Sequence, residues 1–420
     1  MLAVPIVSHT FASIRWNVDE INQLDRDTRK TLTMCRSLHP NASVQRLCLP
    51  RREGGRGLIN IEWLYNRLVI GAVYQIRRSS DPLMCMVREA EKDGTQGSFL
   101  HKTAVRACQA LKIPFDAALA SRKKDNILEK PKQELKTLLK RAVCQHLKEE
   151  HLQKPMHGQY FKLVSEQGLS PELSFSYLTP PTLYSEREGY MTAVQDGVFH
   201  TLAYAKRVLG MPLGNTRCKA CRTHEETVMH LLSACPRYAP TLYTDRHNMA
   251  LKVLYYHLRH EYKIDEQSIA PYQVRDPDAV ITNDRCKMYW NFFFSITSQL
   301  PHNKPDLVIL DSLEKKMYVI EMSCPAGTNI ADKEDEEIRK YKDLMYDFKN
   351  SYKEYETIFI PIIVGVMGGM KSNIAAYLGK IKIIKSKNIK GLTNQMQNYV
   401  ILGSLRILRS HEASHSPTKG

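Results

Sequence analysis

Two carboxylates, Asp306 and Glu321, are the side chains of this chain best placed to do chemistry. They flank a predicted hairpin in which two short apolar runs rich in β-branched residues enclose a polar connection over residues 311–316. If Leu310 pairs with Met317, Asp306 falls opposite Glu321, with Cβ atoms roughly 5 Å apart. Carboxylates this close repel each other unless a cation lies between them. We therefore predict a magnesium or manganese site; the alternative is an exposed hairpin with two acidic residues.

The segment after the hairpin supplies a candidate lysine. Residues 330–344 carry acids in the first turns and bases later, as the helix dipole favours. In a helix, Lys340 can project back toward the two carboxylates, and Lys333 is the alternative lysine. The apolar run at residues 357–365 predicts a buried central strand. Pro361 lies inside that run, so it needs a bulge or a free sheet edge.

A second set of residues has the spacing of zinc ligands. The pattern Cys-x2-Cys-x8-His-x4-Cys offers three thiolates and one imidazole, from Cys218, Cys221, His230 and Cys235. Four such ligands close a tetrahedral site with no open position, which predicts a structural zinc rather than a catalytic one. His224 is a rival ligand, and the alternative is that these are unrelated residues of a reduced protein. A short helix from residue 230 should end before Pro236.

The overall charge predicts a nucleic-acid partner. The formal charge is +16 and the sequence pI about 9.3, which favours salt-sensitive attraction to phosphates. Three glycines at positions 54, 55 and 57 could let the backbone approach a phosphate, although a flexible turn explains them equally well. Residues 121–141 could form a positive helix face or merely a solvated surface. The predicted nucleic-acid-binding residues are Arg51, Arg52, Arg56, Lys123 and Lys124.

Other features limit the class of protein. No apolar stretch reaches the roughly 18 residues that a bilayer span needs, so we expect no membrane partner. The cysteines are scattered without a small disulfide scaffold, which favours a reducing compartment, nuclear or cytoplasmic. A helix over residues 243–262 should turn Leu251, Leu254, Tyr255 and Leu258 toward a core. The last dozen residues look disordered.

These motifs together resemble a known family. Strand, strand, helix and strand, with Asp306, Glu321 and a lysine at one end, resemble the PD-(D/E)xK nuclease core. Ser323 stands where the plain motif has its lysine. The sequence Lys340-Tyr341-x-x-Leu344 is instead similar to the restriction-like endonuclease of non-LTR retrotransposons, in which the next helix supplies the lysine. The preceding CCHC set and the Gly-Gly-Arg-Gly-Leu run at 54–58 fit the same family's zinc knuckle and thumb region.

The resemblance implies an α+β fold with a helical N-terminal half, a CCHC zinc knuckle and a C-terminal nuclease core around a mixed sheet. The implied segments are a thumb-like helical part (1–80), a basic helical linker (81–205), the knuckle (206–245), the endonuclease (246–390) and a C-terminal tail (391–420).

It also implies an activity: metal-dependent nicking of double-stranded DNA for target-primed reverse transcription, with element RNA as a further partner. No Asp-Asp dipeptide of a polymerase palm is present, so we expect no reverse transcriptase activity and interpret the chain as the C-terminal part of a longer protein.

Two positions depart from the family pattern. Glu321 stands where aspartate is usual, and Glu337 where a second lysine is usual. Glutamate is an adequate ligand, but Glu337 replaces a positive group near the phosphate with a negative one. The alternative function is therefore a catalytically inactive, nucleic-acid-binding remnant. A zinc-dependent protein-interaction module is a weaker third possibility, because the charge disfavours it.

Overall fold

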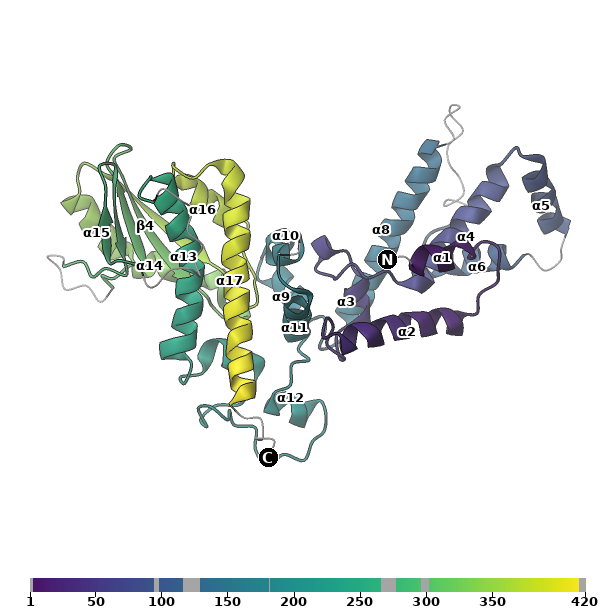
Figure 1. The fold of residues 1–420 in the computed structure, drawn as a ribbon, viewed down its shortest axis with the longest axis horizontal. Coiled ribbons are helices and arrows are strands. Elements are labelled where there is room, and N and C mark those ends of the chain that lie inside the picture. Colours follow the sequence, from purple (N-terminus) through teal and green to yellow (C-terminus); the bar gives the residue numbers. More distant parts are fainter. Residues whose placement is uncertain are drawn as a thin grey trace. The chain divides into compact units, whose positions relative to one another are not determined.

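The computed structural model describes residues 3–93, 98–115, 129–180, 182–265, 277–295 and 302–414. The chain forms two compact units, one of residues 1–51 and 55–154, the other of residues 52–54 and 155–420. The segment predicted as a linker, 81–205, is thus divided between the two. Strands in the described residues begin only at Val280, after a long helical part, so the predicted α+β class is confirmed (Figure 1).

The first unit is helical. Its longer helices bury a core that centres on Val69, Ile70 and Val73, in the middle of the fourth helix. The N-cap of the second helix is Asn17, one of the two residues, Asn17 and Asp19, that the sequence offers as its cap. The Asn17 side chain accepts from the backbone N–H of Asp19, and Glu20 closes a capping box. The helices are α1 (Ala3–His9), α2 (Val18–Met34), α3 (Val44–Cys48), α4 (Ile61–Arg78), α5 (Pro82–Asp93), α6 (Phe99–Ala110) and α8 (Glu129–Gln153), with a short turn η1 (Arg51–Glu53) after α3.

The glycine-rich segment after α3 is a turn that closes on the end of that helix. Gly55 donates to Pro50 O at 3.1 Å, and Gly57 donates to Leu49 O at 2.9 Å. A Cβ atom at Gly55 would lie 2.1 Å from Leu49 O, and Gly57 has a φ of +68°. The packing of the turn itself therefore explains both glycines, and phosphate contact stays a prediction.

The second unit contains one five-stranded sheet. Its strands are β1 (Val280–Thr282), β2 (Cys286–Trp290), β3 (Leu307–Asp311), β4 (Lys316–Ser323) and β5 (Glu356–Ile363), in the order β1-β2-β3-β4-β5. The first four are antiparallel neighbours and β5 is parallel to β4, so the sheet is mixed as expected. Leu310 pairs with Met317, which confirms the predicted register of the hairpin. The central position predicted for the strand at 357–365 is wrong, because β5 is the last strand in the order. Pro361, which cannot donate to a neighbouring strand, meets the free-edge condition there.

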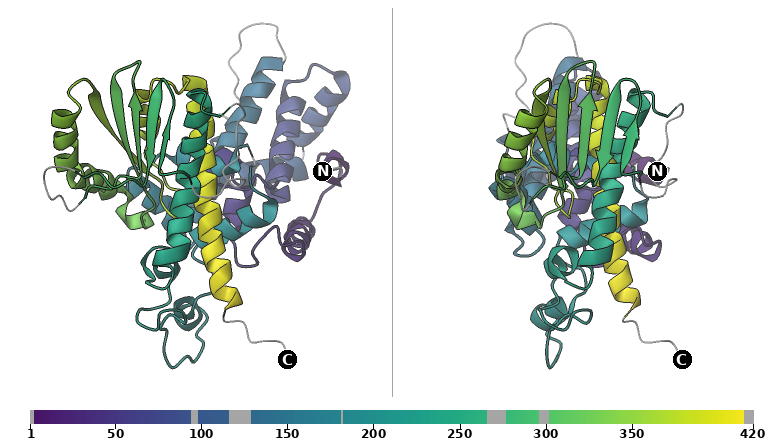
Figure 2. Two further views of the ribbon diagram at one scale, coloured as in Figure 1. Left: turned by 60° about the vertical axis from the view of Figure 1, so that its left-hand side comes forward. Right: turned by 90° about the vertical axis from the view of Figure 1, so that its left-hand side faces the viewer.

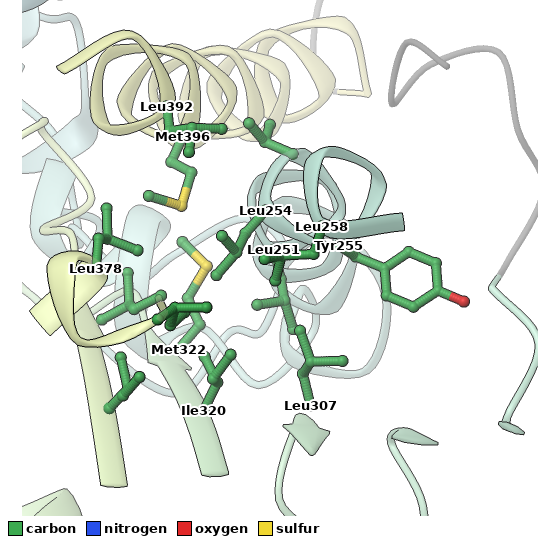
Figure 3. Packing of buried hydrophobic residues seen from close by; sticks show 14 of the residues in the cluster. Leu251, Leu254, Tyr255, Leu258, Leu307, Ile320, Met322, Leu378, Leu392 and Met396 are labelled. Carbon is green, nitrogen blue, oxygen red and sulfur yellow. The ribbon is translucent and has the colours of Figure 1, made fainter. Parts of the chain in front are cut away.

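Helices cover both faces of the sheet. On one face lie α13 (Thr244–Glu261), α16 (Ile374–Lys380) and α17 (Ser386–Ala413), and α13 and α17 run side by side (Figure 2). Figure 3 shows the predicted stripe of α13 packed against β3 and β4, with side chains of α16 and α17 alongside. The other face packs on Tyr341, Leu344 and Phe348, from the end of α14 (Ile330–Lys340) and from α15 (Lys342–Ser351).

Two expectations about helix ends are wrong. The helix expected over 330–344 divides at Tyr341, which is the C-cap of α14 and the N-cap of α15. The last dozen residues are not all disordered, because α17 continues to Ala413 and buries Leu408 and His411. The remaining helices of this unit are α9 (Gln159–Glu166), α10 (Pro171–Ser174), α11 (Ser185–Gln195) and α12 (Leu202–Arg207). In the described part of the chain, none of the helices has the length and apolarity required to cross a bilayer.

Two glycines of the first unit should respond oppositely to alanine. Gly55→Ala should destabilise the unit by about 1–3 kcal/mol because the new Cβ meets the backbone of Leu49. Gly71→Ala, inside α4 with no atom within 4 Å of the new Cβ, should stabilise it by about 0.5–1 kcal/mol. Hydrogen exchange of amides 44–78 in the full chain measures both. Equal protection in the two variants would contradict the tight turn.

Candidate functional site

The predicted zinc ligands come together. The ligand atoms of Cys218, Cys221, His230 and Cys235 all lie within 4.8 Å of one another. A tight turn presents the first two, since Cys218 N donates to His224 O and Arg222 N donates to Cys218 O, each at 2.7 Å. One π-helical turn, η3 (His230–Ala234), presents the imidazole and ends at Cys235. These residues could hold a metal ion, as the sequence pattern predicted.

The pKa shifts of the cysteines in this cluster are compatible with a bound cation. Burial alone would raise the pKa of Cys221, but hydrogen bonds from Thr223 and from the His224 backbone lower it to about 5. Burial raises the pKa of Cys235 to about 12, and the nearby Cys218 and Cys221 add to that rise. A thiolate next to sulfurs that resist ionisation is stabilised by a bound cation. The rival ligand His224 is not a member of the four-ligand group; its ring stacks on His230, with centroids 5.3 Å apart.

The Cys/His cluster is fastened to α17 by a buried contact between a carboxylate and a histidine that the sequence did not suggest. Glu226 Oε2 lies 3.0 Å from His411 Nε2, and the Glu226 carboxylate also accepts from the backbone N–H of Leu202 and Lys219. Burial would raise the pKa of Glu226, but the bond with His411 and these backbone donors lower it to about 2. Glu226 and His411 also lie within ligand distance of Cys218. They already pair with each other, so we treat them as a support of the knuckle.

The predicted carboxylates and lysine also come together, at the edge of the sheet where β3 begins and β4 ends. Glu321 Oε2 accepts from the backbone N–H of Asp306 at 3.2 Å, and Glu321 Oε1 lies 3.0 Å from Lys340 Nζ. Asp306 Oδ2 accepts from the backbone N–H of Met322 at 2.8 Å. The hairpin register thus positions both acids, and α14 supplies the lysine.

The charges of this site are coupled. Burial raises the pKa of Glu321 and the neighbouring charge of Asp306 raises it further, while Lys340 offsets part of the rise. Burial would lower the pKa of Lys340, but Glu321 and Glu337 raise it above its ordinary value, so the lysine is charged. A buried carboxylate whose charge is only partly compensated can accept a divalent cation.

Glu337, the residue that departs from the family pattern, lies between two lysines. Its carboxylate is buried, 2.9 Å from Lys333 Nζ and 3.1 Å from Lys340 Nζ. Lys333, the alternative catalytic lysine, pairs with Glu336 and Glu337. Glu337 therefore contacts a lysine on both sides, but it shares Lys333 with Glu336 and Lys340 with Glu321.

Sequence reasoning missed one residue that contacts Asp306. His247 Nε2, from α13, lies 3.0 Å from Asp306 Oδ2 and 2.9 Å from Met322 O. Burial would lower the pKa of His247, but the charge and hydrogen bond of Asp306 raise it to about 10. A signal was present, because His247 extends the apolar stripe of Leu251 and Leu254 by one turn.

His247 and Asp306 line a cavity of about 470 Å³ at this end of the sheet. Lys304, Asn291 and Ser323 supply further polar groups, and Ser233 of η3 also lines the cavity. Asp306 is thus reachable from a polar cavity, which a reacting phosphate requires.

Three of the five predicted nucleic-acid-binding residues lie among the described residues. Arg51 and Arg52 are in η1, and Arg56 follows in the turn, where its Nη1 donates to Ser37 O at 3.1 Å. Lys123 and Lys124 lie outside the described residues.

A comparison with protein-family models and with curated proteins finds no match to the chain.

The lysine-bearing helix α14 is anchored by Glu334. Its carboxylate accepts from Asn373 Nδ2 at 2.8 Å and from Tyr377 Oη at 2.6 Å, and Lys371 Nζ lies 3.3 Å away. Burial would raise the pKa of Glu334, but these donors lower it below its ordinary value. The anchor ties α14 to the loop before α16 and to α16 itself.

Glu334→Gln should therefore remove a pH-dependent part of stability. The folded pKa lies below the unfolded one, so the carboxylate stabilises the fold above about pH 4.3 and loses this effect as pH falls through the folded pKa. We expect the variant to lose about 1–3 kcal/mol at neutral pH and less in acid. Urea unfolding at a series of pH values measures the difference. Asp335→Asn, an exposed neighbour, should change stability by less than about 0.5 kcal/mol throughout, and an E334Q deficit that does not shrink in acid would contradict the anchor.

Proposed function

We propose that the chain is a metal-dependent DNA endonuclease that nicks a phosphodiester bond at the end of β3 and β4. The observation that carries the proposal is that two acids and a lysine from separate parts of the chain lie in contact. Glu321 contacts both the Asp306 backbone and the Lys340 ammonium. This is the residue set of the nuclease core that the motifs resemble.

Asp306 and Glu321 would hold magnesium or manganese. The residues fit such an ion, because hard oxygen ligands suit it and the raised pKa of Glu321 marks a carboxylate short of positive charge. When bound, the metal supplies an activated water and neutralises charge on the phosphate. Lys340 remains charged beside Glu321 and would stabilise the negative charge that develops on the phosphate.

The second metal would be a structural zinc in the CCHC cluster. Three sulfurs and one imidazole nitrogen match zinc, and four protein ligands leave no position for a reacting water. Its role would be to hold the knuckle folded against the first turn of α13, at the start of the proposed nuclease part.

Double-stranded DNA is the proposed substrate, with element RNA as a possible further partner. The net charge of +16 supports a polyanionic partner. The order of the motifs supports membership of the restriction-like endonucleases of non-LTR retrotransposons, and with it a role in nicking the target site for reverse transcription.

A second candidate function is DNA binding without cleavage. The contact that favours it is Glu337 with Lys340, because a carboxylate 3.1 Å from the catalytic lysine competes with a phosphate for the same ammonium. The nicking experiment below separates the two candidates.

The zinc proposal predicts about one zinc per chain. Cys221→Ser should lose the metal and increase hydrogen exchange over residues 210–240, since the binding energy of a structural zinc is largely folding energy. Elemental analysis and hydrogen exchange measure the two effects. Cys35→Ser, the same change at an exposed cysteine, is the control and should retain the metal. Wild-type protein without zinc would refute the assignment.

The nuclease proposal predicts that nicking of supercoiled plasmid needs magnesium or manganese. Asp306→Asn and Lys340→Ala should each slow nicking by about 100-fold or more, because each removes a group that acts on the metal or the phosphate. Asparagine keeps an oxygen that can accept from Met322 N, so folding should persist.

Lys349→Ala controls for the lysine, since it removes the same charge from the exposed surface of α15. It should bind DNA and nick like the wild type. A wild-type protein that binds DNA but does not nick it would establish the binding function instead.

A further inference from the structure

His247 reaches the candidate nuclease site from outside the sequence motif. It lies on α13, before the sheet, and its Nε2 atom contacts Asp306 Oδ2 at 3.0 Å and Met322 O at 2.9 Å. Its side chain is 22% exposed and that of Asp306 13%, so the contact is largely shielded from water. Neither the CCHC spacing nor the acid and lysine motif includes this residue.

The contact fixes one oxygen of Asp306. Oδ2 accepts from Met322 N at 2.8 Å as well as from His247, so backbone and imidazole hold the same atom from two directions. A carboxylate whose one oxygen is held by two donors cannot rotate freely, which presents its other oxygen in a constant direction. Outer partners of this kind commonly set the orientation of metal-binding carboxylates.

We propose that His247 is a positioning residue for Asp306, which orients the carboxylate for the divalent metal. The inference rests on the proposed nuclease function and adds a residue to its site. The same Nε2–H is shared with Met322 O, 2.9 Å away, so the imidazole also links the end of β4 to α13.

The zinc-binding turn determines where His247 lies. Tyr243 Oη donates to Leu231 O at 2.7 Å and accepts from Cys235 N at 3.0 Å, just before α13 begins. The buried Arg246 donates from Nη1 to Leu232 O at 2.7 Å. These bonds fasten the first turn of α13 to η3, which places the next residue, His247, against Asp306.

An orienting role of His247 and a purely electrostatic role predict opposite changes in divalent-cation affinity when the imidazole is removed. Loss of a positive group beside the carboxylate would strengthen binding of a divalent cation by reducing repulsion. Loss of an orienting donor would weaken binding, because the free carboxylate must be ordered by the metal itself. A glutamine at this position is neutral but keeps an N–H donor, so it separates the two effects.

The test titrates Mn²⁺ into the full-length zinc-loaded chain, with electron paramagnetic resonance as the readout, and measures nicking at each metal concentration. His247→Ala should weaken Mn²⁺ binding and raise the metal concentration for half-maximal nicking by about 10-fold, while DNA affinity is unchanged. His247→Gln should restore most of both. His260→Ala, an exposed histidine near the other end of α13, should match the wild type.

The outcomes separate this inference from the function on which it rests. Equal or tighter Mn²⁺ binding by His247→Ala would overturn the positioning role, whether or not the wild type nicks. A wild type that binds Mn²⁺ through Asp306 without nicking would overturn the proposed activity, and weaker binding by His247→Ala would still support the positioning. If His247→Ala does not fold, the Gln variant decides: wild-type binding supports the donor role, and a 10-fold loss overturns it.

Discussion

The register of the β3–β4 hairpin is the constraint on which the rest of the candidate site depends. In β4, Tyr318, Ile320 and Met322 face the α13 side, while Met317 and Val319 face the side of Tyr341 and α15. A slip of one residue would exchange these faces and place Glu321 among the apolar side chains beneath α13. Because both faces are buried, the register is strongly fixed, and it sets Glu321 beside the backbone of Asp306.

Helices on the two faces then supply a nitrogen donor to each acid. Lys340 reaches Glu321 from α14, and His247 reaches Asp306 from α13. If only one of the two acids had a nitrogen donor, the other carboxylate would be buried without a compensating positive group, which costs several kcal/mol. The arrangement thus stabilises two neighbouring carboxylates in the folded chain and still leaves a polar cavity in front of Asp306. Glu337, between two lysines, belongs to the same balance of charge.

Local patterns in the sequence predicted the parts of the fold that neighbouring residues determine. The hairpin pairing, the four-ligand spacing, the Asn17 cap and the stripe of α13 each follow from periods or spacings within about two dozen residues. Contacts between distant segments had no such signal. His247 and Asp306 are separated by 59 positions, and the C-terminal end of α17 is ordered partly through His411, which pairs with Glu226. The helix break at Tyr341 was missed for the same reason, because that side chain packs on the sheet.

The boundary expected between knuckle and nuclease, after residue 245, falls inside α13. The physical reason is Arg246, a buried arginine that donates to Leu232 O in η3 and to Ser404 Oγ in α17. Burial lowers its pKa, and Gly403 leaves room for it, since a Cβ there would lie 2.6 Å from Arg246 Cβ. Removal of the turn would leave a buried guanidinium without one of its acceptors. The Cys/His cluster and the sheet are therefore better regarded as one structural unit, in which the packing of η3 and the placement of His247 depend on the same first turns of α13.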